Sequence, residues 1–248
     1  MPKKIVFVTV GTSALEKNFS IRDHNRNVEW GGDKGLDELI LLLNTQDESQ
    51  QSEAQQEFEH QKNYVVSELK NKRQQFLEKV EEQNREKYGL LSSELASLIA
   101  MEKAKETDEV KVPGLFSEND VIYLLHSDTA EGRLCAEVIE ATLPDYIKLP
   151  PNIEIVTITG LQMNNPYNFL TVGIPNLMQA VEDRVKEFTV DYYLNITGGY
   201  KGSIPFLTVL AAELRESYEV YLVYLFEKAP EVLIRPAHNL KTPIPPVE

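Results

Sequence analysis

The chain has 248 residues, 26% of them charged, and a formal net charge of −14 at pH 7. Such an acidic chain is not expected to bind long DNA or RNA, because proteins that do so present a basic face. The single cysteine, Cys135, excludes an internal disulfide and a cysteine-based zinc cluster. No apolar run reaches the roughly 18 residues of a membrane span, so we expect a cytoplasmic protein without a membrane partner.

The first predicted strand, residues 4–10, leads directly into the turn Gly11-Thr12-Ser13. This turn alone is a weak signal for a ligand site, because Ser and Thr side chains commonly cap helices. It gains weight if a second turn of the same kind lies at the same edge of a sheet.

Gln, Glu and Lys dominate residues 45–112, and this part of the chain is predicted to be helical. The residues that mark one apolar stripe, at alternating steps of seven and four, are Phe58, Val65, Leu69, Phe76 and Val80. A second amphipathic helix is predicted at 90–101. We therefore expect an inserted helical hairpin that projects from the domain as a dimer contact, a lid or a passive arm packed only on itself.

An α/β pattern follows the insertion. A strand at 121–125 precedes His126-Ser127-Asp128 and a helix at 129–143, and a strand at 153–159 precedes an Asn-rich loop at 160–173. Pro175 is expected to open the next helix, which ends near residue 188. Further strands are predicted at 191–196, 220–226 and 232–235. This order indicates one domain over residues 1–248, with a Rossmann-like, mostly parallel sheet flanked by helices.

The most informative stretch is DYYLNITGGYKGS at 191–203, a strand followed by two glycines and a helix. In a parallel sheet this junction lies at the carboxyl end of a strand, where ligands bind. Gly198 and Gly199 permit a close approach of the backbone, and the free N–H groups at the helix start attract an anion. Lys201 adds a positive charge, so a phosphate-bearing ligand is predicted.

Other nucleotide and metal signatures do not occur. The first strand is not followed by G-x-G-x-x-G, and G-G-Y-K-G-S lacks the Walker A spacing. None of the four histidines, His24, His60, His126 and His238, has metal-ligand spacing with another, and no pair of carboxylates stands out. We therefore expect neither a cofactor nor a metal.

The pair of motifs VTVGTS, after the first strand, and LNITGGYKG, after a late strand, resembles the CARF domains of type III CRISPR systems. Those domains are Rossmann-like homodimers that bind cyclic oligoadenylates across their two-fold axis. The chain has no R-x(4–6)-H motif of a HEPN ribonuclease, so it resembles the stand-alone ring nucleases. In these enzymes a serine after the first strand and a lysine in the late glycine turn are catalytic, which implies Ser13 and Lys201 here. The ligand contacts that the resemblance implies are Gly11, Thr12, Ser127, Asp128, Asn195, Thr197, Gly198, Gly199 and Tyr200.

The resemblance implies cyclic tetra-adenylate as the ligand of a homodimer, because a two-fold axis suits a four-membered ring. A ribose 2′-hydroxyl can cut its own phosphodiester and leave a 2′,3′-cyclic phosphate without a metal. Ser13 would position the ribose or the phosphate, and Lys201 would neutralise the transition state. Two alternatives are a non-catalytic sensor that acts on a partner protein through residues 45–112, and an unrelated α/β enzyme for a phosphorylated metabolite.

Overall fold

The computed structural model describes residues 3–14, 47–81, 91–104, 114–149, 151–162, 165–225 and 232–236. Six strands form one sheet in the order β3-β2-β1-β4-β5-β6. They are β1 (Lys4–Val10), β2 (Val121–Ser127), β3 (Asn152–Ile158), β4 (Asp191–Asn195), β5 (Glu219–Leu225) and β6 (Val232–Pro236). Strands β1 to β5 are parallel and β6 is antiparallel to β5, which confirms the predicted Rossmann-like sheet.

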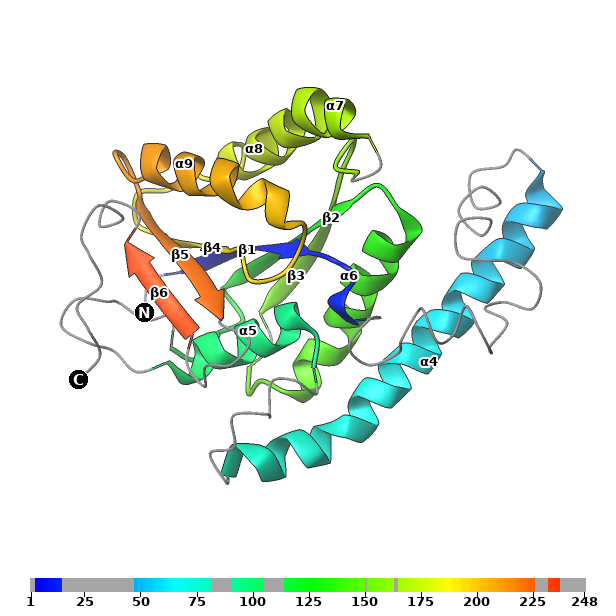
Figure 1. Cartoon of the computed structure of the whole chain (residues 1–248). Helices are drawn as coiled ribbons and strands as arrows, with labels where there is room; N and C mark the ends of the chain where they lie inside the picture. The colour runs from blue at the N-terminus through cyan, green and yellow to red at the C-terminus, as the bar shows by residue number, and fades with distance from the viewer. Residues whose placement is uncertain are drawn as a thin grey trace.

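Helices cover both faces of this sheet (Figure 1). The main ones are α4 (Glu48–Glu81), α5 (Ser93–Lys103), α6 (Ala130–Thr142), α8 (Ile174–Glu182) and α9 (Ile204–Leu214). The central strand β1 is buried along its whole length, and its side chains alternate between the two cores. Val6 and Val8 pack with α5 and α6, whereas Ile5 and Phe7 pack with α8 and α9. The apolar run of β1 is therefore typical of a strand that is covered on both faces.

The second helix of the inserted segment, α5, belongs to the sheet-covering layer and not to a projecting arm. It contacts β1, β5 and β6. Nine of its residues are buried, and they include the polar side chains of Glu94, Ser97 and Glu102. Ser92 caps the helix, since its side chain accepts a hydrogen bond from the Leu95 N–H at 3.1 Å. The expectation of an arm packed only on itself is thus wrong for α5.

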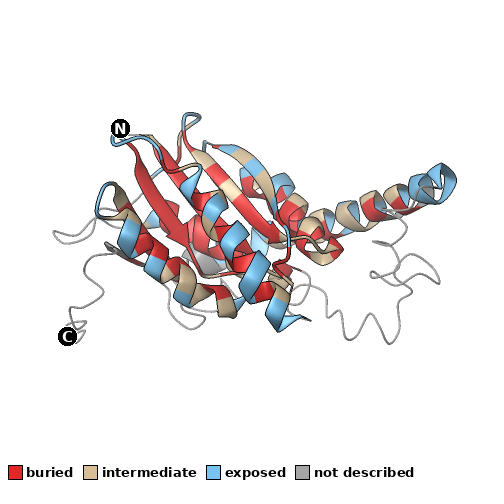
Figure 2. Ribbon diagram, turned by 90° about the horizontal axis from the view of Figure 1, so that it is seen from above, coloured by how far each residue is buried: buried red, intermediate tan, exposed pale blue. Residues whose placement is uncertain are grey.

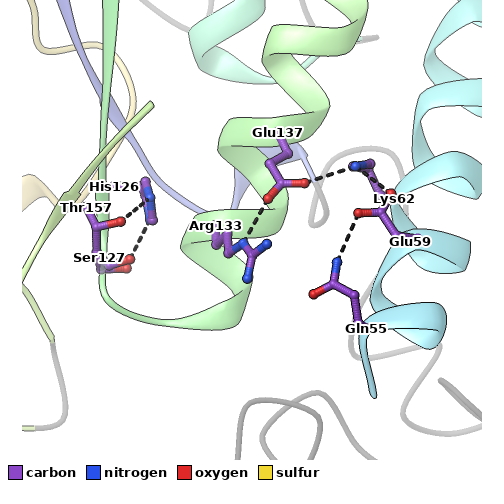
Figure 3. A network of polar contacts seen from close by, with 8 residues as sticks. All are labelled: Gln55, Glu59, Lys62, His126, Ser127, Arg133, Glu137 and Thr157. Atoms are coloured by element: carbon purple, nitrogen blue, oxygen red, sulfur yellow. Dashed lines mark hydrogen bonds and ion pairs between the residues drawn. The ribbon is translucent and has the colours of Figure 1, made fainter. Parts of the chain in front are cut away.

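The long helix α4 also packs on the α/β body, along the outer side of α6. The predicted stripe is buried where the structure describes its side chains, with Phe58, Val65 and Leu69 at most 1% exposed. Lys62 Nζ lies 3.1 Å from Glu137 Oε2 and so pairs α4 with α6 (Figure 3). In Figure 2 the exposed end of the long helix extends beyond the body. Although α4 is long, no described helix combines the length and apolar character needed to cross a membrane.

The helix before β4 begins earlier than Pro175. It starts as α7 (Pro166–Asn168), continues through the π-helical segment η3 (Phe169–Gly173) and ends as α8. The side chain of Asn165 caps it by accepting from the Asn168 N–H at 3.0 Å, and Pro166 takes the first helical position. Pro175 lies inside the helix, two residues after the π-helical segment ends, and lacks the N–H that other helical residues carry. The predicted loop at 160–173 is therefore helical in its second half.

The strand order places the β1–β4 pair at a topological switch point. The chain passes from β1 to β2 and β3 on one side, and then returns to β4 on the other side of β1. Ligands of open α/β sheets bind at the carboxyl ends of the strands next to such a point. The turns after Val10 and Asn195 both lie there.

Candidate functional site

The two glycine turns meet at the switch point. A Cβ atom on Gly11 would stand 3.1 Å from Gly199 Cα, so the backbones of the two turns are in direct contact. Gly199 has a φ of +75°, which side-chain-bearing residues rarely adopt. The turns after β1 and β4 can therefore approach one another only because both positions are glycine.

Internal hydrogen bonds hold the β4 turn in shape. Thr9 Oγ1 donates to the Gly198 carbonyl at 2.8 Å. Asn195, which is 1% exposed, donates through Nδ2 to Ser97 Oγ at 2.7 Å, and its Oδ1 accepts from the Thr197 N–H at 3.1 Å. The hydroxyl of Thr197 accepts from the Leu225 N–H at 3.0 Å. Asn195 and Thr197 thus shape the turn, and a direct contact of either with a ligand stays a prediction.

A carboxylate of the protein itself lies where the two turns meet. Glu94, on the first turn of α5, is 0% exposed. Its Oε1 accepts from the N–H groups of Gly11 at 2.9 Å and Gly199 at 3.3 Å. A Cβ atom on Gly198 would collide with the same oxygen. The backbone nest expected for a phosphate therefore has the geometry to hold an anion, and the side chain of Glu94 supplies that anion.

The same carboxylate holds Ser13. The Ser13 hydroxyl donates to Glu94 Oε2 and accepts from the Ser93 N–H at 2.9 Å. Ser13 lies directly after the β1 turn and is half-buried, and Thr12 precedes it at the same exposure. The start of α5 therefore fixes the position of Ser13, for which a catalytic role implied by the resemblance stays a prediction.

Tyr200 and Lys201 continue the β4 turn on its outer side. Lys201 is exposed and opens the 3-10 turn η4 (Lys201–Ser203), and the Ser203 hydroxyl donates to the Tyr200 carbonyl at 2.7 Å. The Tyr200 ring is 37% exposed and meets the ring of Phe169 edge to face, with 5.0 Å between centroids. An exposed aromatic ring and a cation therefore lie next to the glycine contact, although no hydrogen bond or ion pair joins Lys201 to Ser13.

The turn after β2 forms a separate part of this sheet edge. Asp128 accepts from the Gly160 N–H and from Gln162 Nε2, both at 3.0 Å, and so ties the β2 turn to the β3 turn. The hydroxyl of Ser127 lies 2.9 Å from that of Thr129, whose side chain caps α6. Both carboxylate oxygens of Asp128 are thus engaged within the protein, and ligand contacts by Ser127 and Asp128 stay predictions.

His126 is buried at the end of β2 (Figure 3). Its Nδ1 donates to the Ser127 carbonyl at 2.6 Å, and its Nε2 lies 3.0 Å from Thr157 Oγ1. Burial lowers the pKa of the imidazole below its ordinary value, although the Ser127 carbonyl favours the protonated form. A neutral ring accepts from Thr157 through Nε2, so His126 joins β2 to β3 as a structural residue.

Glu94 is the site residue that the sequence does not reveal. An acidic residue in a first helical turn is common, because the helix dipole favours it there. Its partners lie 81 to 105 positions away in the chain, so no local pattern points to them. In the described part of the chain, no three His, Cys, Asp or Glu side chains form a group that could hold a metal ion.

The fold and this site define a Rossmann-like α/β protein whose two glycine turns meet around a buried anion at the switch point. The chain belongs to the Cas_APE2256 family of CRISPR-associated proteins, whose family model matches residues 89–238. The matched region runs from α5 to β6 and contains Glu94 and Lys201, whereas Ser13 precedes it. No curated protein matches the chain.

Proposed function

We propose that this protein binds a cyclic oligoadenylate, preferentially cyclic tetra-adenylate, and cleaves it to switch off type III CRISPR signalling. The observation that carries the proposal is the contact between Gly11 and Gly199. Through this contact the turn that bears Ser13 lies beside the turn that leads to Lys201, at the sheet edge where open α/β proteins in general bind ligands, which supports the proposal. Membership of a CRISPR-associated family supports this cellular context and lends no support to a metabolite enzyme.

The proposed reaction is an attack of a ribose 2′-oxygen on the adjacent phosphorus. The new P–O2′ bond forms as the P–O5′ bond breaks, the 2′-hydroxyl loses its proton, and the leaving 5′-oxygen gains one. The products carry a 2′,3′-cyclic phosphate and a 5′-hydroxyl. The protein contributes by holding the 2′-oxygen in line with the phosphorus, near Ser13. The Lys201 ammonium stabilises the charge that develops on the phosphoryl oxygens.

A symmetric ring requires a second copy of the site. One sheet edge offers one Ser13 and one Lys201, so we propose a homodimer whose two-fold axis passes through the ring. Sedimentation of the protein with cyclic tetra-adenylate at micromolar concentration should give the mass of a dimer. A monomer under these conditions would contradict the shared site.

A second candidate function is a non-catalytic sensor of the same ligand, and one observation favours it. The Glu94 carboxylate already occupies the N–H groups of Gly11 and Gly199. These donors are then not available to a phosphate, and a fixed negative charge nearby opposes the charge that develops during cleavage. A sensor would bind the ring and pass the signal to a partner protein.

Incubation of the purified protein with cyclic tetra-adenylate and EDTA, followed by chromatography of the products, separates these functions. Linear products that end in a 2′,3′-cyclic phosphate are expected. Tight binding of an intact ring would support the sensor. Failure to bind or cleave the ring would overturn both functions, and cleavage that EDTA abolishes would contradict the metal-independent reaction.

A further inference from the structure

The hydrogen bonds of Ser13 restrict what it can offer to a ligand. A serine hydroxyl has one O–H donor and two acceptor lone pairs. An ionised carboxylate only accepts, so the Ser13 O–H is donated to Glu94 Oε2. One lone pair accepts from the Ser93 N–H at 2.9 Å. The capacity that remains on this half-buried side chain is a single lone pair, which can meet only a donor.

We propose that Glu94 is a positioning residue that makes Ser13 a hydrogen-bond acceptor, so that Ser13 binds a ribose 2′-hydroxyl and not a phosphate oxygen. This inference rests on the proposed function. Phosphate oxygens at neutral pH are acceptors and cannot pair with the remaining lone pair. The 2′-hydroxyl is the donor that distinguishes a ribonucleotide ring from its deoxy counterpart.

The surroundings of Glu94 fix its orientation. Both N–H donors on Oε1 belong to glycine turns whose backbones are in contact, and the carboxylate is 0% exposed. Oε2 therefore points to Ser13 and accepts its hydroxyl proton. The Ser93 N–H, at the start of the same helix, donates to the Ser13 oxygen. Ser93 and Glu94 of α5 therefore determine that the Ser13 hydroxyl can act only as an acceptor toward a ligand.

Glu94→Gln should change the Ser13 hydroxyl from an acceptor to a donor toward the ligand, with almost no change in side-chain shape. The N–H groups of Gly11 and Gly199 require an acceptor, so the amide oxygen takes the place of Oε1. The amide NH₂ then faces Ser13 Oγ and donates to it, which occupies the remaining lone pair and releases the Ser13 O–H. Ser13 becomes a donor in this variant and can no longer accept from a 2′-hydroxyl.

The test compares the affinities of cyclic tetra-adenylate and its all-2′-deoxy analogue by calorimetry. All proteins carry Lys201→Ala, which keeps the ribonucleotide ring intact during the measurement. The parent, which carries Lys201→Ala alone, should bind the ribonucleotide ring about 5- to 100-fold more tightly than the deoxy ring, as expected for two hydrogen bonds, one to each Ser13 of the proposed dimer. Glu94→Gln should bring this preference within about twofold. In a protein that retains Lys201, Glu94→Gln should also slow single-turnover cleavage.

Glu102→Gln is the matched control. Glu102 is a buried carboxylate of the same helix that accepts from the Lys148 N–H at 3.4 Å, and none of its described hydrogen bonds involves Ser13. This variant should keep the preference of the parent. If Glu94→Gln does not fold, as judged by thermal unfolding, Ser13→Ala provides the same comparison, because it removes the acceptor itself and should abolish the preference.

The outcomes distinguish this inference from the proposed function. Equal affinities of the parent for the two rings, or a preference that persists in Glu94→Gln and in Ser13→Ala, would overturn the role of Glu94 while ring binding stands. Failure of the parent and the wild type to bind either ring would overturn the proposed function, and the inference with it.

Discussion

Thr9 and Gly199 lie so close that a Cβ atom added to Gly199 would stand 2.6 Å from Thr9 Cβ. The carbonyl carbon of Thr9 would lie 3.1 Å from the same added atom, and the Thr9 hydroxyl donates to the Gly198 carbonyl of the β4 turn. The β1 and β4 turns are thus packed without space for one methyl group. The relative position of the residues that follow them depends on this contact.

Gly199→Ala should destabilise the protein by more than the backbone penalty alone. Gly114 offers the matched control, because its φ is +61° and a Cβ atom there would meet nothing within 4 Å. Gly114→Ala should cost about 1 kcal/mol of unfolding free energy for the positive φ. Gly199→Ala should cost a further 1–3 kcal/mol or so for the collision with Thr9. Equal costs in urea unfolding would show that the turns separate easily.

Lys201→Ala should slow cleavage of cyclic tetra-adenylate more than it weakens binding. The lysine is proposed to meet charge that develops in the transition state, and loss of such a contact costs on the order of 10²–10³ in rate. Single-turnover cleavage and equilibrium binding measure the two effects. Lys186→Ala is the control, because Lys186 is exposed and precedes β4, at the opposite edge of the sheet.

If Lys201 is only a solvated surface residue, the cleavage rate of Lys201→Ala should lie within about threefold of the wild-type rate, because surface substitutions usually change free energies by roughly 0.5 kcal/mol or less. That result would remove Lys201 from the proposed site. An equal loss of affinity and rate would assign the lysine to ligand binding alone.

Leu69→Ala should destabilise the whole domain, although the residue lies on the inserted helix α4. Its side chain is 1% exposed within the core that α4 shares with α6, and its carbonyl accepts from the Tyr146 hydroxyl at 2.7 Å. Removal of a buried leucine side chain costs about 2–5 kcal/mol. Chemical denaturation measures the loss, with exposed Asn63→Ala on the same helix as the control. A loss as small as that of Asn63→Ala would restore the interpretation of α4 as a passive arm.

His126 should make the protein less stable in mild acid. Burial lowers the pKa of its imidazole in the folded protein, whereas the unfolded chain titrates near the ordinary value of about 6.5. Below that pH the unfolded chain binds more protons, so the contribution of His126 to stability is present above about pH 6.5 and is lost as the pH falls toward the folded pKa. His126→Gln should therefore lose less unfolding free energy than the wild type between about pH 7.5 and 5.5.

Exposed His60→Gln is the control for removal of one histidine. The same pH dependence in His126→Gln and the wild type would mean that His126 is accessible to protons in the folded state. It would then not serve as the neutral link between β2 and β3.

The strands and the two glycine turns are predictable from the sequence, because short apolar runs that end in glycine are local signals. The environment of α5 is not. Glu94, Ser97 and Glu102 suggest a solvent-facing side of an amphipathic helix, yet all three are buried. Their polar groups are satisfied by partners that the chain brings from far away, such as Gly11 and Asn195. A polar residue in the sequence does not show whether water or a distant backbone will satisfy it.

The same reason limits the prediction of the site. The β1 and β4 turns are recognisable, and parallel strands place both at one edge. The role of Glu94, whose carboxylate accepts hydrogen bonds from both turns, cannot be recognised from the sequence. A carboxylate in the first turn of a helix usually needs no partner beyond the helix itself. Likewise, Asn165 and Pro166 form the start of the helix in the structure, whereas the sequence pattern predicts that start at Pro175. A π-helical segment followed by an internal proline leaves no simple mark in the sequence.

The position of α5 also has a consequence for how the chain acquires its fold during synthesis. The helix is made directly after α4, but it lies against β5 and β6, which leave the ribosome more than a hundred residues later. Until then Leu95, Leu98 and Ile99, which are fully buried in the finished protein, lack much of their cover. Domains are synthesised from the amino terminus, and apolar surface that waits for its partner is prone to aggregation. The amino-terminal half therefore depends on β5 and β6, which are synthesised later, to cover α5.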